Sequence, residues 1–155
     1  MDDKKYDLTN EALWHRGRTL HRIRALKDFG YVKKGDLGGW IEIEENLSHV
    51  GKSWIANEAK VYDDAKVSGN AQVIGKACVF NDAKVYENAL VGGNAHVYCI
   101  ATIYGNAKVF ESAIVFGNAR VKYHVVISGK ANISSQEDLD KYLEAQKNNS
   151  KNTSM

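Results

Sequence analysis

The sequence predicts an all-β protein, a parallel β-solenoid of about five turns with a small N-terminal cap and a short C-terminal helix. A six-residue repeat runs from Ser53 to Ile133 without an insertion. All but one of its fourteen units begin with Ala or Ser, and every unit places Val or Ile two residues later. Proline is absent, so no position lacks the backbone N–H that strand pairing needs. A repeat this short indicates turns that are buried only by their neighbours.

The repeat also predicts which side chains form the core. Alternate side chains of an extended segment face opposite ways, so the small residue and the Val or Ile point to the same side, which we expect to be the inside. The remaining positions include pairs such as Gly69-Asn70 and Asp63-Asp64. Gly, Asn and Asp tolerate positive φ, so these pairs predict sharp corners between short strands. Three such sides closed into a triangle make one turn.

The pattern Val-x-Gly-Asn-Ala-x over residues 47–134 resembles the hexapeptide-repeat superfamily, whose members form left-handed parallel β-helices. The resemblance implies the left-handed coil, because the general rule for parallel connections would give the opposite hand. Gly38-Gly39-Trp40 followed by Asn46-Leu47-Ser48 is similar to the segment that precedes the repeats in an acyltransferase-like subfamily of bacteria and their phages.

The first 46 residues are expected to cap the solenoid, because an uncovered strand edge invites pairing with another chain. The cap ends in a glycine-rich lid, in which Leu37, Trp40 and Ile41 would cover the first turn. Upstream, Leu13 to Leu26 fits either an amphipathic helix or a hairpin that turns at Arg16-Gly17, and the hairpin is the preferred interpretation. The conformation of residues 6–30 stays open at this point.

A short helix is predicted over residues 135–147, after the repeats. Ser135 is its expected N-cap, with Asp138 in a position like that of a capping box. Leu139, Tyr142 and Leu143 share one helical face, which would pack on the coil or on a second subunit. Residues 148–155 are polar and are expected to be disordered.

Composition excludes several classes of protein. With 21 basic and 19 acidic residues the net charge is +2, which favours neither a nucleic-acid binder nor an acidic tail for the chain as a whole. Cys78 and Cys99 are too few for a disulfide framework or a thiolate metal site, so no metal is expected, and free thiols fit a reducing cytosol. No apolar run is long enough to span a membrane. The expected location is the cytoplasm.

One outer face of the predicted triangle is unusually apolar. Side chains three units apart stack in one column, and this face carries Tyr62, Phe80, Tyr98, Ile114 and Phe116. A contiguous apolar patch predicts an interface, either with another copy of the chain or with another protein. The alternative is that stacked aromatic rings only stabilise strand pairing.

The same face carries the candidates for catalysis. Many members of the superfamily are acyl-CoA-dependent transferases that use a histidine as general base, and His96 is the one histidine on a flat side of the predicted coil. Such enzymes usually extrude a loop that closes the acyl-donor site, whereas these repeats are uninterrupted. Cys78, one turn before His96, could pair with it as a nucleophile, but no third orienting group is visible and Ile114 continues the column.

The N-terminal segment contains a basic patch with interleaved aromatic residues. It could bind nucleic acid or an acidic protein. A solvated strand face beside Glu42, Glu44 and Glu45 explains it as well. The patch consists of Arg16, Arg18, Arg22, Arg24, Lys27, Lys33 and Lys34.

The function predicted from the sequence is therefore non-catalytic. We expect a rigid scaffold that needs no cofactor and presents its aromatic face to another copy of the chain or to a partner protein. Because phages encode chains of similar pattern, an accessory role in binding a host protein is one version of this hypothesis. The alternative is a small acyltransferase with His96 as its base and acetyl-CoA as its donor.

Overall fold

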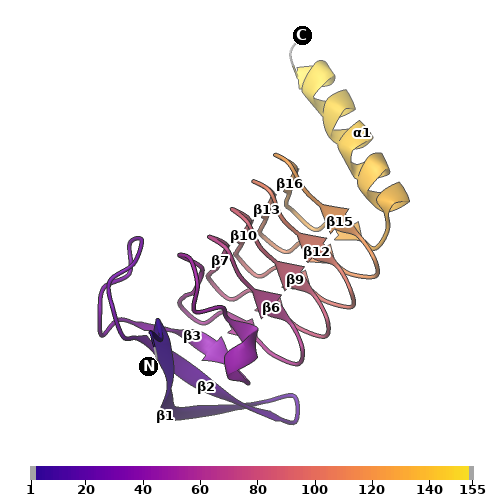
Figure 1. Ribbon diagram of the computed structural model, residues 1–155. Coiled ribbons are helices and arrows are strands. Elements are labelled where there is room, and N and C mark those ends of the chain that lie inside the picture. The colour runs from indigo at the N-terminus through magenta and orange to yellow at the C-terminus, as the bar shows by residue number, and fades with distance from the viewer. Residues whose placement is uncertain (1–2, 154–155) are drawn as a thin grey trace.

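Three sheets, whose repeat strands all pair in parallel, form a triangular solenoid, with a hairpin at one end and a helix at the other (Figure 1). The computed structural model describes residues 3–153, and the side chains of residues 3–149. We name the sheets A, B and C. Sheet A has eight strands in the order β1-β2-β3-β5-β8-β11-β14-β17, sheet B has five in the order β16-β13-β10-β7-β4, and sheet C has four in the order β15-β12-β9-β6.

The strands of the repeats are short, and each spans two residues. Sheet A contains β1 Tyr6–His15, β2 Arg18–Ala25, β3 Leu37–Ile41, β5 Lys60–Val61, β8 Cys78–Val79, β11 His96–Val97, β14 Ile114–Val115 and β17 Asn132–Ile133. Sheet B contains β4 Trp54–Ile55, β7 Gln72–Val73, β10 Leu90–Val91, β13 Lys108–Val109 and β16 Val126–Ile127. Sheet C contains β6 Lys66–Val67, β9 Lys84–Val85, β12 Thr102–Ile103 and β15 Arg120–Val121. The one 3₁₀ helix of the described residues, η1, spans Glu44–Asn46, and α1 spans Gln136–Thr153.

The core is the one that the repeat predicts. All fourteen Val or Ile side chains of the third position are at most 2% exposed. Equivalent residues of successive turns pair in parallel, as Val61 does with Val79 and Val97 with Val115. The parallel β-solenoid of about five turns is therefore confirmed, and it is lined by branched aliphatic side chains.

Outside the two-residue strands, the backbone hydrogen bonds between turns run in one direction. The amide of Lys60 donates to the carbonyl of Ala77 at 2.9 Å, and the amide of His96 donates to that of Ala113 at 3.0 Å. Parallel pairing within the strands adds bonds in the reverse direction, but most N–H groups donate to the carbonyls of the following turn. The first turn consequently has mainly carbonyls without partners, and the last turn has mainly N–H groups without partners, so the two ends need caps of opposite chemistry.

The corners have a second ladder, made by side chains. The first residue of each corner has positive φ, between 56° and 67° in the repeats. Where that residue is not Gly, its side chain often accepts the amide of the equivalent corner one turn later. Asn57 accepts from Gly75 at 3.1 Å, Asn81 from Cys99 at 3.1 Å and Glu87 from Gly105 at 3.0 Å. These bonds offset part of the cost of left-handed backbone.

The solenoid begins one turn earlier than the repeat. Ile41 and Leu47 are buried in the core and pair with Val61 and Val67, twenty residues on rather than eighteen. Two additional residues in this irregular turn break the six-residue period, so the sequence shows no repeat there. The expected lid is partly wrong: Ile41 lies inside, but Leu37 is 56% exposed and Trp40 lies on the outer surface under the hairpin.

Gly38 and Gly39 are required by the close approach of β3 to the next turn. A Cβ atom at Gly39 would lie 2.5 Å from the carbonyl oxygen of Ala59, and one at Gly38 would lie 2.5 Å from that of Ile55. Any side chain would therefore push β3 away from the coil.

Donor side chains cap the N-terminal end. The fully buried Lys5 donates from Nζ to the carbonyl of Ser53 at 2.7 Å, and Tyr6 donates its hydroxyl to the carbonyls of Glu44 at 2.7 Å and Leu47 at 2.5 Å. The buried Asn46 donates from Nδ2 to the carbonyl of Ala65 at 2.9 Å. These groups replace the N–H donors of a missing turn.

Acceptor side chains cap the other end. The amide of Ser134 donates to Oδ2 of Asp138 at 2.9 Å, and the amide of Ser128 donates to the hydroxyl of Tyr142 at 3.1 Å. Leu139 is buried against the last turn, with Tyr142 and Leu143 packed beside it. Both acceptors come from α1, which therefore closes the apolar core and supplies hydrogen-bond partners.

The helix differs from the prediction in two respects. Ser135 is confirmed as its N-cap, since its Oγ accepts the amide of Asp138 at 3.2 Å, but the Asp138 carboxylate reaches Ser134 instead of closing a capping box. The helix also continues to Thr153, six residues beyond the predicted end at residue 147. A polar sequence does not prevent the extension of a helix that is already nucleated by packing. Residues 154–155 lie outside the described part.

Truncating a buried valine of the core should lower the free energy of unfolding much more than truncating the outward-facing side chain next to it. We expect Val85→Ala to lower the free energy of unfolding by about 1.5–3 kcal/mol, because Val85 is fully buried. Lys84→Ala, one residue away on the exposed side, should change it by less than about 0.5 kcal/mol. Urea denaturation of the two variants measures the difference, and equal losses would contradict the assignment of the inner column.

The cap at Lys5 should make stability depend on pH in the alkaline range. Burial, with a further contribution from Lys27, lowers the pKa of Lys5 from 10.5 to about 8. Between pH 8 and 10.5 the unfolded chain binds more protons at this residue than the folded chain, so its contribution to the free energy of unfolding rises with pH. The difference in stability between the wild type and Lys5→Met should therefore grow across this range, and a constant difference would contradict the buried position of Nζ.

Candidate functional site

A column of four stacked aromatic rings runs along the outer surface of sheet A. We call Tyr62, Phe80, Tyr98 and Phe116 the aromatic column. Ring centroids are 5.1 Å apart for Tyr62 and Phe80, 4.9 Å for Phe80 and Tyr98, and 5.2 Å for Tyr98 and Phe116, with interplanar angles between 2° and 11°. The repeat places one ring on each turn, so the column is rigid before anything binds to it.

The β1–β2 hairpin covers the N-terminal half of this column. β1 and β2 pair in antiparallel fashion, so the structure has the hairpin rather than the helix. Leu20 and Trp40 are buried with Tyr62, and Leu13 and Phe80 pack against the three. The ring of His15 meets that of Tyr62 edge-on at 5.2 Å. The chain therefore buries the N-terminal half of its own apolar face.

The C-terminal half of the face is less covered. Tyr98, Ile114 and Phe116 remain partly exposed, whereas Tyr62 is only 3% exposed. Trp14, in β1, is 73% exposed, but it alternates with Leu13 and His15 and therefore points away from the aromatic column. Adjacent exposed apolar groups on a rigid strand surface are typical of protein-binding sites.

Cationic and imidazole groups gather beside the aromatic column. Lys60, Cys78 and His96 occupy successive turns in register, and the hairpin brings His15 and Arg16 to them. We call His15, Arg16, Lys60 and His96, with Cys78 between them, the cationic cluster. The sequence pointed to His96 and Cys78 but missed His15, although the alternation of Leu13 and His15 in a strand indicates that both face the same way.

The electrostatics of the cluster follow from burial and from its positive charges. Burial lowers the pKa of His15, and Lys60, Arg16 and His96 lower it further. Burial and then Arg16 lower the pKa of His96. Burial raises the pKa of the Cys78 thiol, and Lys60 and Arg16 oppose that rise. Both imidazoles are therefore more often neutral at pH 7 than a free histidine, and the thiol stays protonated.

This environment does not activate a nucleophile. A reactive cysteine needs a lowered thiol pKa, whereas that of Cys78 is raised and its side chain is 7% exposed. The ring of His96 meets Phe80 edge-on at 6.5 Å, and among the described residues no side-chain or backbone group accepts a hydrogen bond from it. Among the described residues, His96 thus has no orienting partner of the kind that general bases use.

The predicted basic patch is divided by the structure. Arg22 pairs with Glu11 and Glu58, each at 3.2 Å, and lies over the Trp40 ring at 4.3 Å. Arg24 pairs with Asp7 at 3.1 Å, Lys27 pairs with Asp3 at 3.0 Å, and Arg18 is also paired. Lys33 and Lys34 lie apart from these residues, in the exposed loop before β3. Arg16 alone joins the cationic cluster.

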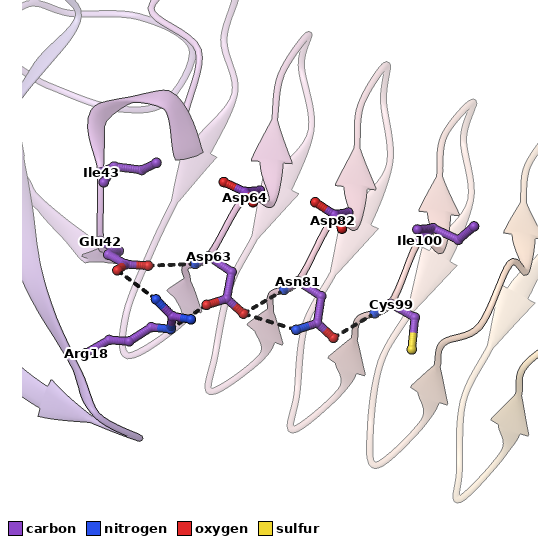
Figure 2. A pocket seen from close by; sticks show the side chains of 9 residues that line it. All are labelled: Arg18, Glu42, Ile43, Asp63, Asp64, Asn81, Asp82, Cys99 and Ile100. Carbon is purple, nitrogen blue, oxygen red and sulfur yellow. Dashed lines mark hydrogen bonds and ion pairs between the residues drawn. The ribbon is translucent and has the colours of Figure 1, made fainter.

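A polar groove of about 500 Å³ follows the corner between sheets A and C (Figure 2). Arg18 reaches into it from the hairpin, forming an ion pair with Asp63 and another with Glu42 at 3.1 Å. Glu42 accepts the amide of Asp63 at 2.8 Å, and Asp63 accepts the amide of Asn81 at 3.0 Å. Figure 2 shows these contacts as one continuous chain along the corner. Since most of the polar groups are paired with one another, the groove mainly fastens the hairpin tip to the coil.

Comparison with known proteins adds no assignment, because no protein-family model and no curated protein matches the sequence. Over the described residues, no helix is both long and apolar enough to cross a membrane. The same part of the chain contains no group of three or more His, Cys, Asp or Glu side chains arranged to hold a metal ion.

The two half-buried imidazoles, His15 and His96, should make the protein less stable in mild acid. Their folded-state pKa values lie below 6.5, so the unfolded chain binds more protons as the pH falls through 6.5, and the free energy of unfolding falls with it. We expect a His15→Gln, His96→Gln double variant to lose less stability than the wild type over this range. The matched control is His124→Gln, which removes an exposed histidine outside the cluster. Equal pH dependence in the wild type and the double variant would contradict the prediction.

Proposed function

We propose that this protein is a non-catalytic binding module of the hexapeptide-repeat β-helix type, and that its sheet A face binds an acidic, apolar segment of another protein. The observation that carries the proposal is the position of the aromatic column. Its first half is covered by the chain's own hairpin, with the positive charges of Arg16 and Lys60 beside it, and its second half, which begins on the turn of His96, lies partly exposed.

The apolar part of the site explains where binding energy would come from. Aromatic side chains bury large areas and contribute most at the centre of interfaces. Tyr98 and Phe116 are held by stacking on their neighbours, so little side-chain entropy remains to be lost when a partner covers them.

The charged part of the site indicates the chemistry of the partner. Arg16 and Lys60 lie beside the aromatic column, and the described acids nearest to them are engaged elsewhere, as Glu58 is with Arg22 and Trp40. A two-fold pairing of this face with itself would place two such positive clusters in one interface, which costs free energy. A foreign acidic segment complements the charge, so we favour it over a second copy of the chain.

The resemblance of Gly38-Gly39-Trp40 and Asn46-Leu47-Ser48 to chains of bacteria and phages makes a host protein one candidate partner. The competing hypothesis of acyl transfer has no specific observation in its favour. If it were correct, acetyl-CoA would raise the melting temperature of the wild type, and His96→Ala would abolish that rise.

Substitution of Tyr98 and Phe116, the partly exposed half of the aromatic column, should abolish binding of the partner segment. Selection of displayed peptides on the immobilised protein is expected to yield acidic sequences that contain aromatic or branched residues. A Tyr98→Glu, Phe116→Glu double variant should lose these peptides by at least about tenfold, because two buried rings each contribute more than about 1 kcal/mol.

The chain provides a matched control for this experiment. Tyr86 and Tyr104 stack at 5.0 Å on the outer surface of sheet C, so Tyr86→Glu, Tyr104→Glu makes the same kind of change on another face. It should retain the peptides. A solution molar mass of more than one chain that falls to one in the Tyr98→Glu, Phe116→Glu variant would contradict the foreign partner and would indicate self-association.

A further inference from the structure

The turn of the β1–β2 hairpin has an arginine where the backbone disfavours one. Arg16 and Gly17 form a two-residue turn with φ values of 51° and 81°. Left-handed conformation at both central positions is that of a type I′ turn, which prefers Asn or Asp before Gly. A larger residue at that position costs about 1 kcal/mol or more.

In the described part of the folded chain, no hydrogen bond or ion pair of Arg16 offsets this cost. Arg16 makes no hydrogen bond or ion pair with any described residue, whereas Arg18, Arg22, Arg24 and Lys27 are all paired with acids. Four corner residues with positive φ, Asn57, Asp63, Asn81 and Glu87, accept an amide through their side chains, whereas Arg16, like Cys99, Glu111 and Tyr123, does not. A strained residue without a structural role suggests a functional one.

The hairpin tip is nevertheless held in a fixed place. Arg18, two residues further on, is anchored to Asp63 and Glu42 in the corner groove (Figure 2). His15, on the other side of the turn, packs edge-on against Tyr62. The position of Arg16 over sheet A is therefore fixed from both sides of the turn.

The groups that Arg16 faces are mostly hydrogen-bond donors. Nε2 of His15 is buried and has no hydrogen-bond partner among the described residues. Lys60, Cys78 and His96 lie on successive turns below it. The cluster thus combines a guanidinium, an ammonium, two imidazole N–H groups and a thiol, and it includes no carboxylate.

We propose that the Arg16 turn and the column of Lys60, Cys78 and His96 form a binding site for a carboxylate group. Arginine binds a carboxylate through two parallel N–H bonds, and the free nitrogen of His15 can supply a further donor. The rings of Tyr62 and Phe80 beside the cluster favour an acid that is attached to an apolar body. The site deepens the proposed function and depends on it only for the source of the carboxylate, a Glu or Asp of the partner segment.

Benzoate, a carboxylate on an aromatic ring, tests the site without a protein partner. Titration followed by NMR of the His15 and His96 rings should give a saturable shift, and the bound anion should raise the pKa of both. Arg16→Gln should lose the saturable shift, whereas Arg120→Gln, an exposed arginine on sheet C, should keep it. Absence of saturation in the wild type, or an equal response in Arg16→Gln, would overturn the proposal.

Inorganic phosphate is the second probe. If phosphate binds more tightly than benzoate, the site selects a phosphate group and the carboxylate assignment is wrong.

A third variant separates a functional role from a structural one. Arg16→Asn places a residue that type I′ turns prefer at the strained position, so the melting temperature should rise while benzoate binding is lost. A fall in melting temperature would show that Arg16 stabilises the hairpin, and the argument from strain would fail.

The outcomes also separate this site from the proposed function. Loss of benzoate binding with retention of selected peptides would refute the carboxylate site alone. Retention of benzoate binding without any peptide selected on the aromatic column would refute the protein-binding function alone.

Discussion

The hydrogen-bonded pairing between successive turns is the interaction on which the whole molecule depends. Because most of these bonds run from the N–H groups of one turn to the carbonyls of the next, the pairing leaves mainly carbonyls at one end and mainly N–H groups at the other. The chain closes the first end with the donors of Lys5, Tyr6 and Asn46 and the second with the acceptors Asp138 and Tyr142. The terminal segments are thus matched to the polarity of the coil, and buried backbone groups find partners at both ends.

The N-terminal hairpin both caps the coil and covers part of the candidate site. As the edge of sheet A it protects the first turn from pairing with other chains, and as a cover it buries Tyr62 and part of Phe80. The exposure of the aromatic column consequently differs between its two halves, although the repeat that produces the column is the same in both. The corner contacts of Arg18 fix the tip of the hairpin, so Arg16 lies near Tyr62 and His96.

Backbone strain is distributed in an informative way. Corner residues with positive φ are numerous, and at Asn57, Asn81 and Glu87 the strain is offset by a side-chain bond to the next turn. Arg16 lacks such compensation and lies near Lys60 and the two imidazoles of the cationic cluster. Proteins commonly sacrifice some stability where a residue serves binding, and the solenoid, with its continuous aliphatic core, can tolerate that loss.

The sequence by itself determined the coil, the inner column, the corners and the aromatic column, because a six-residue period repeats the same local choice on every turn. It also identified Ser135 as the helix cap, a local interaction. Only the tertiary structure decided the division of the basic patch and the irregular first turn. In that turn two additional residues break the six-residue period, so the sequence does not show that Ile41 and Leu47 belong to the core. The tertiary structure alone also brings Arg16 and His15 close to Lys60 and His96. This depends on contacts between residues more than forty positions apart, which no local pattern encodes.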